Sequence, residues 1–176
     1  MMRVIILCAS VALVLWAALL PAQEVHVTSE NGVVTLALVA ERPYSLMTAG
    51  QQRTPVLSVI CQQKGKKTGH AIAFSPGGIL SEQQYSTFGN SASLTLSVNL
   101  GGQKASTNWV SYGNVENFTY YGKTEPERIA FLRALLNAPK VVIEFTPFLT
   151  GVATSSTFDL TGLRAEFEKH PECAIK

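Results

Sequence analysis

Large apolar side chains occupy every second position along several short stretches of this chain. Residues 93–99 and 141–146 are the clearest examples. A two-residue period predicts β-strands with one buried face. Turn signals separate the stretches: Asn31-Gly32 is typical of a two-residue hairpin, and Gly101-Gly102 indicates another turn. Closely spaced strands with short turns favour antiparallel pairing over alternating strands and helices.

Two segments near the C-terminal end have a helical period instead. Residues 125–138 carry Ile129, Leu132, Leu135 and Leu136 at helical spacing, and Pro139 follows them. In the second segment, Leu160, Leu163 and Phe167 repeat the spacing before Pro171. The sequence therefore predicts a mainly β fold, with antiparallel sheets arranged like a β-sandwich and two helices near the C-terminus.

Polar residues at the starts of these segments predict helix caps. Thr124 and Glu127 have the spacing of a capping box, in which each side chain accepts a hydrogen bond from a free backbone amide near the other residue. Asp159, the one aspartate of the chain, directly precedes the second helical segment. We expect it to cap that helix, since aspartate at this position usually accepts from free amides.

The first 22 residues differ from the rest of the chain. A short positive start at Arg3 is followed by an apolar run from Val4 to Leu20 and by Pro21-Ala22. This layout is typical of a secretory signal peptide, and a retained membrane anchor is the alternative. We predict a signal peptide at residues 1–22, a single exported β-rich domain at 23–176, and no stable membrane span after cleavage.

Cleavage after residue 22 removes Cys8 and leaves Cys61 and Cys173. An even pair of cysteines in an exported chain predicts a disulfide. The bond would close a loop of roughly 110 residues, for which the chain-entropy relation gives about 4–5 kcal/mol of stabilisation. The predicted location is the periplasm or the extracellular medium.

Charge and composition exclude some classes of function. Charged residues make up 15% of the chain and the formal net charge is +2. Proteins that bind nucleic acid usually carry a strongly basic patch, and this low charge gives no sign of one. Lys64, Lys66 and Lys67 cluster between glycines and are interpreted as a solvated hairpin tip, with a phosphate or lipid-headgroup contact as the alternative.

Residues with catalytic potential are few and scattered. His26, His70 and His170 lie far apart and have no metal-ligand spacing. Glu116 and Glu144 could pair across strands, but no pattern brings them together. No nucleophile motif is present, and Asp159 has a capping role as its simplest interpretation. We therefore predict no enzymatic activity, no metal and no cofactor.

One set of motifs resembles a known family. The order is Leu57-Ser58-Val59-Ile60-Cys61, Trp109-Val110-Ser111, a helix reading Phe-Leu-Arg-Ala-Leu-Leu, Phe145-Thr146-Pro147-Phe148, Thr157-Phe158-Asp159-Leu160-Thr161-Gly162-Leu163 and a final cysteine. Over about residues 55–173 this resembles the VasI-type proteins, which are small exported proteins associated with type VI secretion gene clusters in Gram-negative bacteria. The resemblance implies an accessory or interaction role.

Three functions remain as hypotheses. The first is an exported cell-envelope accessory protein that binds an envelope protein, associated with type VI secretion. The alternatives are an envelope hydrolase using Asp159 or Glu144 with a histidine, and a purely structural envelope protein. For a binding protein, the polar segments 81–90 and 101–107 are the predicted contact regions, since loops commonly carry function.

Overall fold

A computed structural model describes residues 24–45, 52–65, 67–78, 80, 85–88, 91–112, 117–147 and 150–175 of the chain. The predicted signal peptide at 1–22 lies outside this part. Among the described residues, no helix combines the length and the apolar character that crossing a membrane requires.

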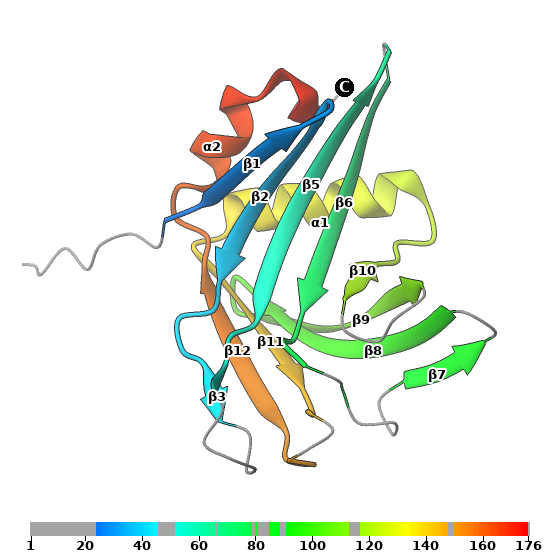
Figure 1. Cartoon of the computed structure of the whole chain (residues 1–176), viewed down its shortest axis with the longest axis vertical. Coiled ribbons are helices and arrows are strands. Elements are labelled where there is room, and N and C mark those ends of the chain that lie inside the picture. Colours follow the sequence, from blue (N-terminus) through cyan, green and yellow to red (C-terminus); the bar gives the residue numbers. More distant parts are fainter. Residues whose placement is uncertain are drawn as a thin grey trace, which may run out of the picture.

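Ten strands in the described part of the chain form one antiparallel sheet. Their spatial order is β1-β2-β5-β6-β10-β9-β8-β11-β12, and β7 pairs with the start of β8. In chain order they are β1 (His26–Glu30), β2 (Val33–Val39), β5 (Val56–Lys64), β6 (Lys67–Ser75), β7 (Tyr85–Phe88), β8 (Ser91–Leu100), β9 (Gln103–Tyr112), β10 (Phe118–Tyr120), β11 (Lys140–Phe145) and β12 (Thr154–Asp159). The predicted antiparallel β class is confirmed. The sheet is continuous and strongly bent, so that its two halves face each other like the layers of a sandwich (Figure 1).

The register keeps the large apolar side chains on one face of this sheet. Leu36 of β2 lies opposite Val59 of β5, and Leu94 of β8 lies opposite Trp109 of β9. All four side chains are buried. Each large apolar side chain buried in this way stabilises the fold by about 1.5–3 kcal/mol. The alternation in the sequence therefore translates directly into one core on the concave side of the sheet.

Phe74 stands at the centre of the core and joins distant strands. Its ring lies 6.2 Å from that of Trp109, 5.4 Å from that of Phe145 and 6.3 Å from that of Phe158, in edge-to-face arrangements. Aromatic pairs favour this geometry because a ring edge is positive and a ring face is negative. The contacts bring β6, β9, β11 and β12 together around one residue.

The bend brings the two ends of the sheet toward each other. The backbone amide of Glu41, just after β2, donates to the carbonyl oxygen of Thr157 on edge strand β12 at 2.9 Å. The preceding amide, that of Ala40, donates to Pro55 at 2.9 Å. The chain after β2 therefore bridges the gap between β5 and β12, and the sheet curls most of the way around its core.

Helix α1 (Glu125–Asn137) crosses behind β2, β5 and β6 (Figure 1). It buries Leu132 and Leu135 in the core. Thr124 is the N-cap as predicted, because the amide of Glu127 donates to its Oγ1 at 3.4 Å, which is one of the two hydrogen bonds of the predicted capping box. Both predicted helices near the C-terminus are thus present, the second being α2 (Leu163–Lys169), which is followed by the 3₁₀ turn η2 (Pro171–Cys173).

The predicted cap at Asp159 is wrong. Asp159 is the last residue of β12, and its Oδ1 accepts from the amide of Thr161 at 2.8 Å. The N-cap of α2 is Gly162, which has a φ of 88° and no side-chain cap. The left-handed turn at Gly162 delays the helix by one turn, so the aspartate stabilises the turn before the helix.

Short strands also occur in polar segments that carry no two-residue period. Segment 41–54 includes β3 (Tyr44–Ser45) and β4 (Gln52–Arg53), which pair with each other. Segment 81–90 includes β7, which pairs with β8 from Tyr85 opposite Leu94 to Phe88 opposite Ser91. These strands are too short to show a period, and they exist because a neighbouring strand supplies their hydrogen bonds.

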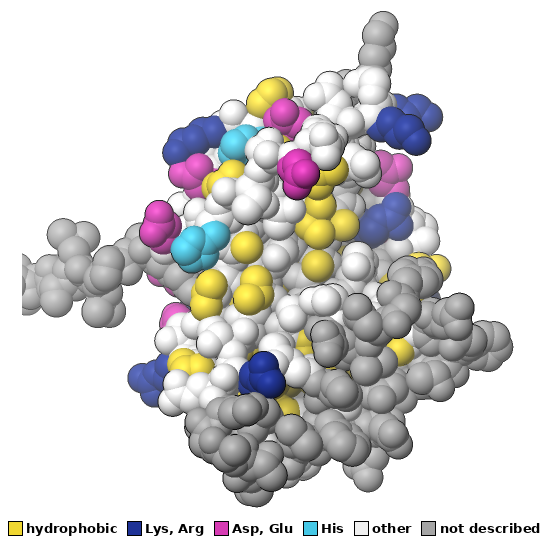
Figure 2. Space-filling model, viewed as in Figure 1, with side chains coloured by type: hydrophobic (Ala, Val, Ile, Leu, Met, Phe, Trp, Pro, Cys, Tyr) yellow, Lys and Arg dark blue, Asp and Glu magenta, His cyan; other side chains and the backbone are white. Residues whose placement is uncertain are grey.

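The convex face of the sheet carries half-buried aliphatic side chains between the front strands. Most of them are small, such as Ala37, Ala71 and Ala73, and Ile60 is a larger one. Figure 2 shows hydrophobic side chains over the middle of this face and charged side chains toward its rim. The convex face therefore has a different character from the core face, which is filled by large aliphatic and aromatic residues.

Candidate partner-binding groove

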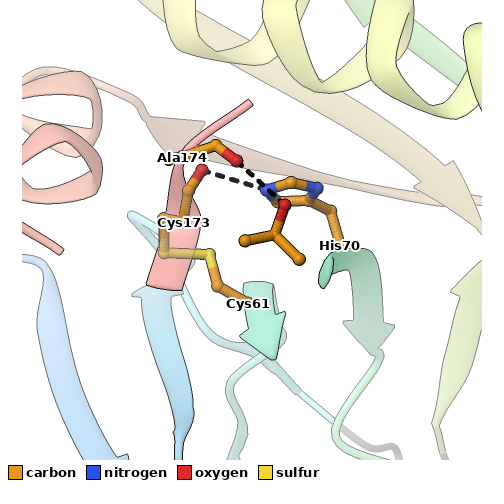
Figure 3. The surroundings of a disulfide bond; sticks show 5 residues. Cys61, His70, Cys173 and Ala174 are labelled. Carbon is orange, nitrogen blue, oxygen red and sulfur yellow. Dashed lines mark hydrogen bonds between the residues drawn. A yellow bond between two sulfur atoms is a disulfide. The ribbon is translucent and has the colours of Figure 1, made fainter. Parts of the chain in front are cut away.

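The predicted disulfide between Cys61 and Cys173 is present and fully buried. It joins β5 to η2 across 112 positions of the sequence (Figure 3). The neighbouring strand adds two hydrogen bonds to the same turn. His70 Nε2 lies 2.9 Å from the carbonyl oxygen of Cys173, and Thr68 Oγ1 donates to that of Ala174 at 3.1 Å. The C-terminal segment is therefore fixed to the sheet by one covalent and two polar contacts.

The other residues considered for chemistry lie apart. His70 stacks on Phe167 with ring centroids 6.0 Å apart and contacts the end of the chain. His26 is exposed on edge strand β1, whereas His170 follows α2. The described residues contain no cluster of three metal-ligating side chains. The structure thus does not bring these three histidines together.

The two glutamates considered as a pair do not form a described site. Glu116 lies outside the described residues. Glu144 is on the convex side of β11, where both carboxylate oxygens accept from Nζ of Lys104 at 2.9 Å. These hydrogen bonds hold the pKa of Glu144 below its ordinary value. Glu144 is consequently ionised at neutral pH and engaged in a surface ion pair.

Strand β9 is paired along only half of the edge that faces β10, and β6 on the other side of β10 is likewise paired there only at Ala73 and Phe74. β8 covers β9 from Gln103 to Tyr112. On the other side, β10 pairs only with Trp109 and Val110, and the amide of Tyr121 then donates to the carbonyl oxygen of Asn108 at 2.8 Å. In the described part of the chain, no strand continues this row beside residues 103–107. Figure 1 shows the short β10 beside the far end of β9.

The direction of the backbone groups on this open edge follows from the Asn108 hydrogen bond. In an antiparallel strand the N–H and C=O of one residue point to the same side, and this side alternates along the strand. Since Asn108 faces β10, Ser106 and Lys104 face the same side, where β10 is missing. Residues 103–106 are exposed. Ser106 and Lys104 therefore direct backbone donors and acceptors outward.

A groove runs between the concave side of this strand and α1. Its volume is about 610 Å³. One wall is the β8–β9 hairpin, with Ala105 and Thr107, and the other is the face of α1 that carries Ala130, Phe131 and Ala134. Short alanine side chains on both walls leave this space unfilled. Among the described lining residues, the single charged side chain is that of Glu127, so the groove is nearly neutral.

Aromatic residues close one end of the groove. The rings of Tyr120 and Phe131 lie 4.3 Å apart, and the ring of Trp109 contacts both in edge-to-face arrangements. Burial, with a further contribution from nearby Glu127, raises the pKa of Tyr120 above its ordinary value. Tyr120 therefore stays neutral at physiological pH and offers a hydroxyl group at the wall of the groove.

One segment of this groove was predicted from the sequence to be a contact region. Segment 101–107 was a predicted contact region, and the structure identifies it as a hairpin turn followed by the first half of β9. The contribution of α1 was not predicted. Ala130 and Ala134 are exposed alanines on a helix, a weak signal of a surface left open for contact.

The chain has no recognisable relative in three comparisons: no protein-family model matches it, and no curated protein or solved structure shows significant similarity. The groove beside β9 is therefore the structural feature from which a function can be proposed.

Proposed function

We propose that this chain is an exported cell-envelope protein that binds a protein partner and does not turn over a substrate. The open half of β9 is the observation that carries this proposal. Exposed backbone N–H and C=O groups on a strand edge form a template for another strand. The side chain of Lys104 on this edge is paired with Glu144 on the convex side of the sheet, and the concave side of the edge borders a groove with one charged lining residue, Glu127.

The proposed mode of binding is strand addition. An extended segment of the partner continues the row begun by β10 and makes backbone hydrogen bonds with Lys104 and Ser106. Side chains of an added strand alternate between two faces. One set enters the groove between Ala105 and Ala134, where small or apolar uncharged side chains fit best because the walls carry little charge.

The setting is proposed from the sequence and the disulfide. A buried disulfide between Cys61 and Cys173 supports export, since such bonds persist in oxidising compartments. The location would be the periplasm or the extracellular medium of a Gram-negative bacterium. The resemblance of residues 55–173 to VasI-type proteins supports an accessory role associated with type VI secretion, with an envelope protein as partner.

Site-specific photo-crosslinking in the source bacterium tests this proposal. A crosslinking side chain is placed at Ala105 or Ala134 in the groove, and at Ala165 on α2 as a control. The first two positions should yield the same crosslinked envelope protein, and Ala165 should not. Equal crosslinking at all three positions, or different proteins at Ala105 and Ala134, would contradict a specific groove.

A second pair of variants tests the role of the backbone. Ser106→Pro removes the outward N–H, whereas Ser106→Ala changes the side chain and keeps that amide. Proline is tolerated on strand edges, so both variants should fold with similar circular dichroism spectra. Ser106→Pro should lose the crosslink from Ala134, and Ser106→Ala should keep it. Loss in both, or in neither, would exclude strand addition at this edge.

A further inference from the structure

A second cavity lies between the two helices, away from β9. Its volume is about 500 Å³, which is within the range of small-molecule sites. Helix α1 contributes Arg133 and Leu136, whereas α2 contributes Arg164 and Phe167. The C-terminal segment closes it with residues such as Ile175. Because the disulfide and the bonds from Thr68 and His70 fix this segment, the wall is held in place.

The polar side of the cavity is built from both helices. Arg164 Nη1 donates to Oδ1 of Asn137 at 2.8 Å, and Arg164 Nε donates to Oε1 of Glu168 at 3.0 Å. Nδ2 of Asn137 in turn donates to the carbonyl oxygen of Arg133 at 2.8 Å. The guanidinium group of Arg164 is therefore oriented by contacts to two elements before any ligand arrives.

The charges at the cavity do not cancel. Arg133 and Arg164 face one carboxylate, that of Glu168, which is paired with Arg164. Within the described part of the chain, Arg133 has no ion-pair partner. The lining consequently carries one excess positive charge above an apolar floor of Leu136, Phe167 and Ile175.

We propose that this cavity binds a small amphipathic anion, with a carboxylate or phosphate group on a short apolar body. Arginine binds planar or tetrahedral anions through paired N–H groups, and it stays charged at every physiological pH. The anionic group would bind between Arg133 and Arg164. The apolar body would lie on Phe167 and its neighbours, where it leaves water. Neither arginine lines the β9 groove, so this proposal is independent of the proposed function.

Isothermal titration with octanoate, octyl phosphate and octanol tests the proposal on the disulfide-bonded protein. Octanoate or octyl phosphate should bind saturably, and octanol, which has the same chain without the charge, should bind at least about tenfold more weakly. Arg133→Gln and Arg164→Gln should each weaken binding of the anion by about tenfold. Arg42→Gln, an exposed arginine elsewhere on the surface, is the matched control and should have no effect.

Two further arms separate the sources of the anion and the causes of a loss. Sedimentation with anionic phosphatidylglycerol vesicles, compared with neutral phosphatidylcholine vesicles, tests a lipid headgroup. Arginine-dependent sedimentation would assign the anion to lipid, and titration without sedimentation would assign it to a free molecule. Ala174→Phe keeps both arginines but fills the cavity, and it should abolish binding. Equal affinity for octanol and octanoate, binding unaffected by either arginine variant, or no saturable binding of any probe would overturn the proposal.

Discussion

His70 Nε2 lies 2.9 Å from the carbonyl oxygen of Cys173, the residue whose sulfur is bonded to Cys61. Cys61 and His70 are directly opposite each other on β5 and β6. The last turn of the described chain is therefore attached to two adjacent strands at one level of the sheet. This attachment also positions α2, since Phe167 stacks on His70. The C-terminal segment, the least secure part of many small domains, is thereby made part of the core.

Removing the disulfide should destabilise the protein strongly. The variant Cys61→Ala/Cys173→Ala avoids leaving a free thiol or a buried hydroxyl group. Because the bond closes a loop of 112 positions, its loss should lower the free energy of unfolding by about 4 kcal/mol. Urea denaturation of the oxidised protein and the variant measures this difference. Mass spectrometry without reductant should find no alkylatable thiol in the folded protein, and a change below about 1 kcal/mol would contradict a structural role.

The capping contact at α1 gives a smaller effect. Thr124→Ala removes the oxygen that accepts from the amide of Glu127, so the free energy of unfolding should fall by about 1 kcal/mol. Thr161→Ala, at another exposed threonine beside a helix start, is the control and should stay within about 0.5 kcal/mol. Urea midpoints at an unchanged slope report both values. Equal effects of the two substitutions would argue against the cap.

These two sites also show what the sequence could and could not predict. The cap at Thr124 depends on residues three positions apart, and the disulfide follows from a count of cysteines in a chain predicted to be exported, so both were predictable. Strands such as β8 were predictable because alternation within one strand reflects one buried face. The prediction that Asp159 caps α2 was wrong because a left-handed turn at Gly162 lies between Asp159 and the helix. The hydrophobic period of the sequence does not show where such a turn ends.

The groove depends on relationships that no local pattern contains. The open half of β9 exists because β10 has three residues and the chain then turns away at Tyr121 toward α1. The groove remains open because Ala130 and Ala134 of α1 lie opposite Ala105 and Thr107 of β9, and these short side chains do not fill the space between the two elements. Segment 101–107 could be recognised as polar from the sequence, but its unpaired edge follows only from the order of strands in the sheet.

The Lys104–Glu144 pair predicts a local pH dependence. Hydrogen bonds from Lys104 hold the pKa of Glu144 below the ordinary value of 4.5. A carboxyl group with a lower pKa in the folded than in the unfolded chain stabilises the fold above the unfolded value, and this contribution is lost as the pH falls through the folded value. Carbon-detected NMR titration should therefore place Glu144 below 4.5. Lys104→Met should move it upward, and Lys67→Met should not.

Because both side chains of this pair are largely exposed, the effect on global stability should be small. Salt should weaken it further, since exposed charges are screened. A pKa for Glu144 that does not respond to Lys104→Met would show that the two hydrogen bonds are not maintained in solution.

Gly122 precedes α1, and we expect any side chain at this position to collide with the first turn of that helix. It is buried, and its carbonyl oxygen accepts from Nη1 of Arg128 at 3.1 Å. A Cβ atom at this position would lie 2.7 Å from Cγ of Arg128 and 3.0 Å from the backbone nitrogen of the same residue. The Arg128 side chain can move, but its backbone nitrogen belongs to the first turn of α1, which would have to shift. Gly122→Ala should therefore lower the free energy of unfolding by about 1–3 kcal/mol.

Gly69 on β6 provides the matched control for this substitution. Its backbone is not left-handed, and the nearest atom to an added Cβ, the carbonyl oxygen of Gln62, is 3.9 Å away. Gly69→Ala should leave stability unchanged or raise it by about 0.4–1 kcal/mol, since alanine restricts the unfolded chain without strain in the fold. Thermal and urea unfolding of both variants decide the comparison. If Gly122→Ala were as stable as Gly69→Ala, α1 would not be held against Tyr120 as closely as described, and the aromatic end of the groove would need a different account.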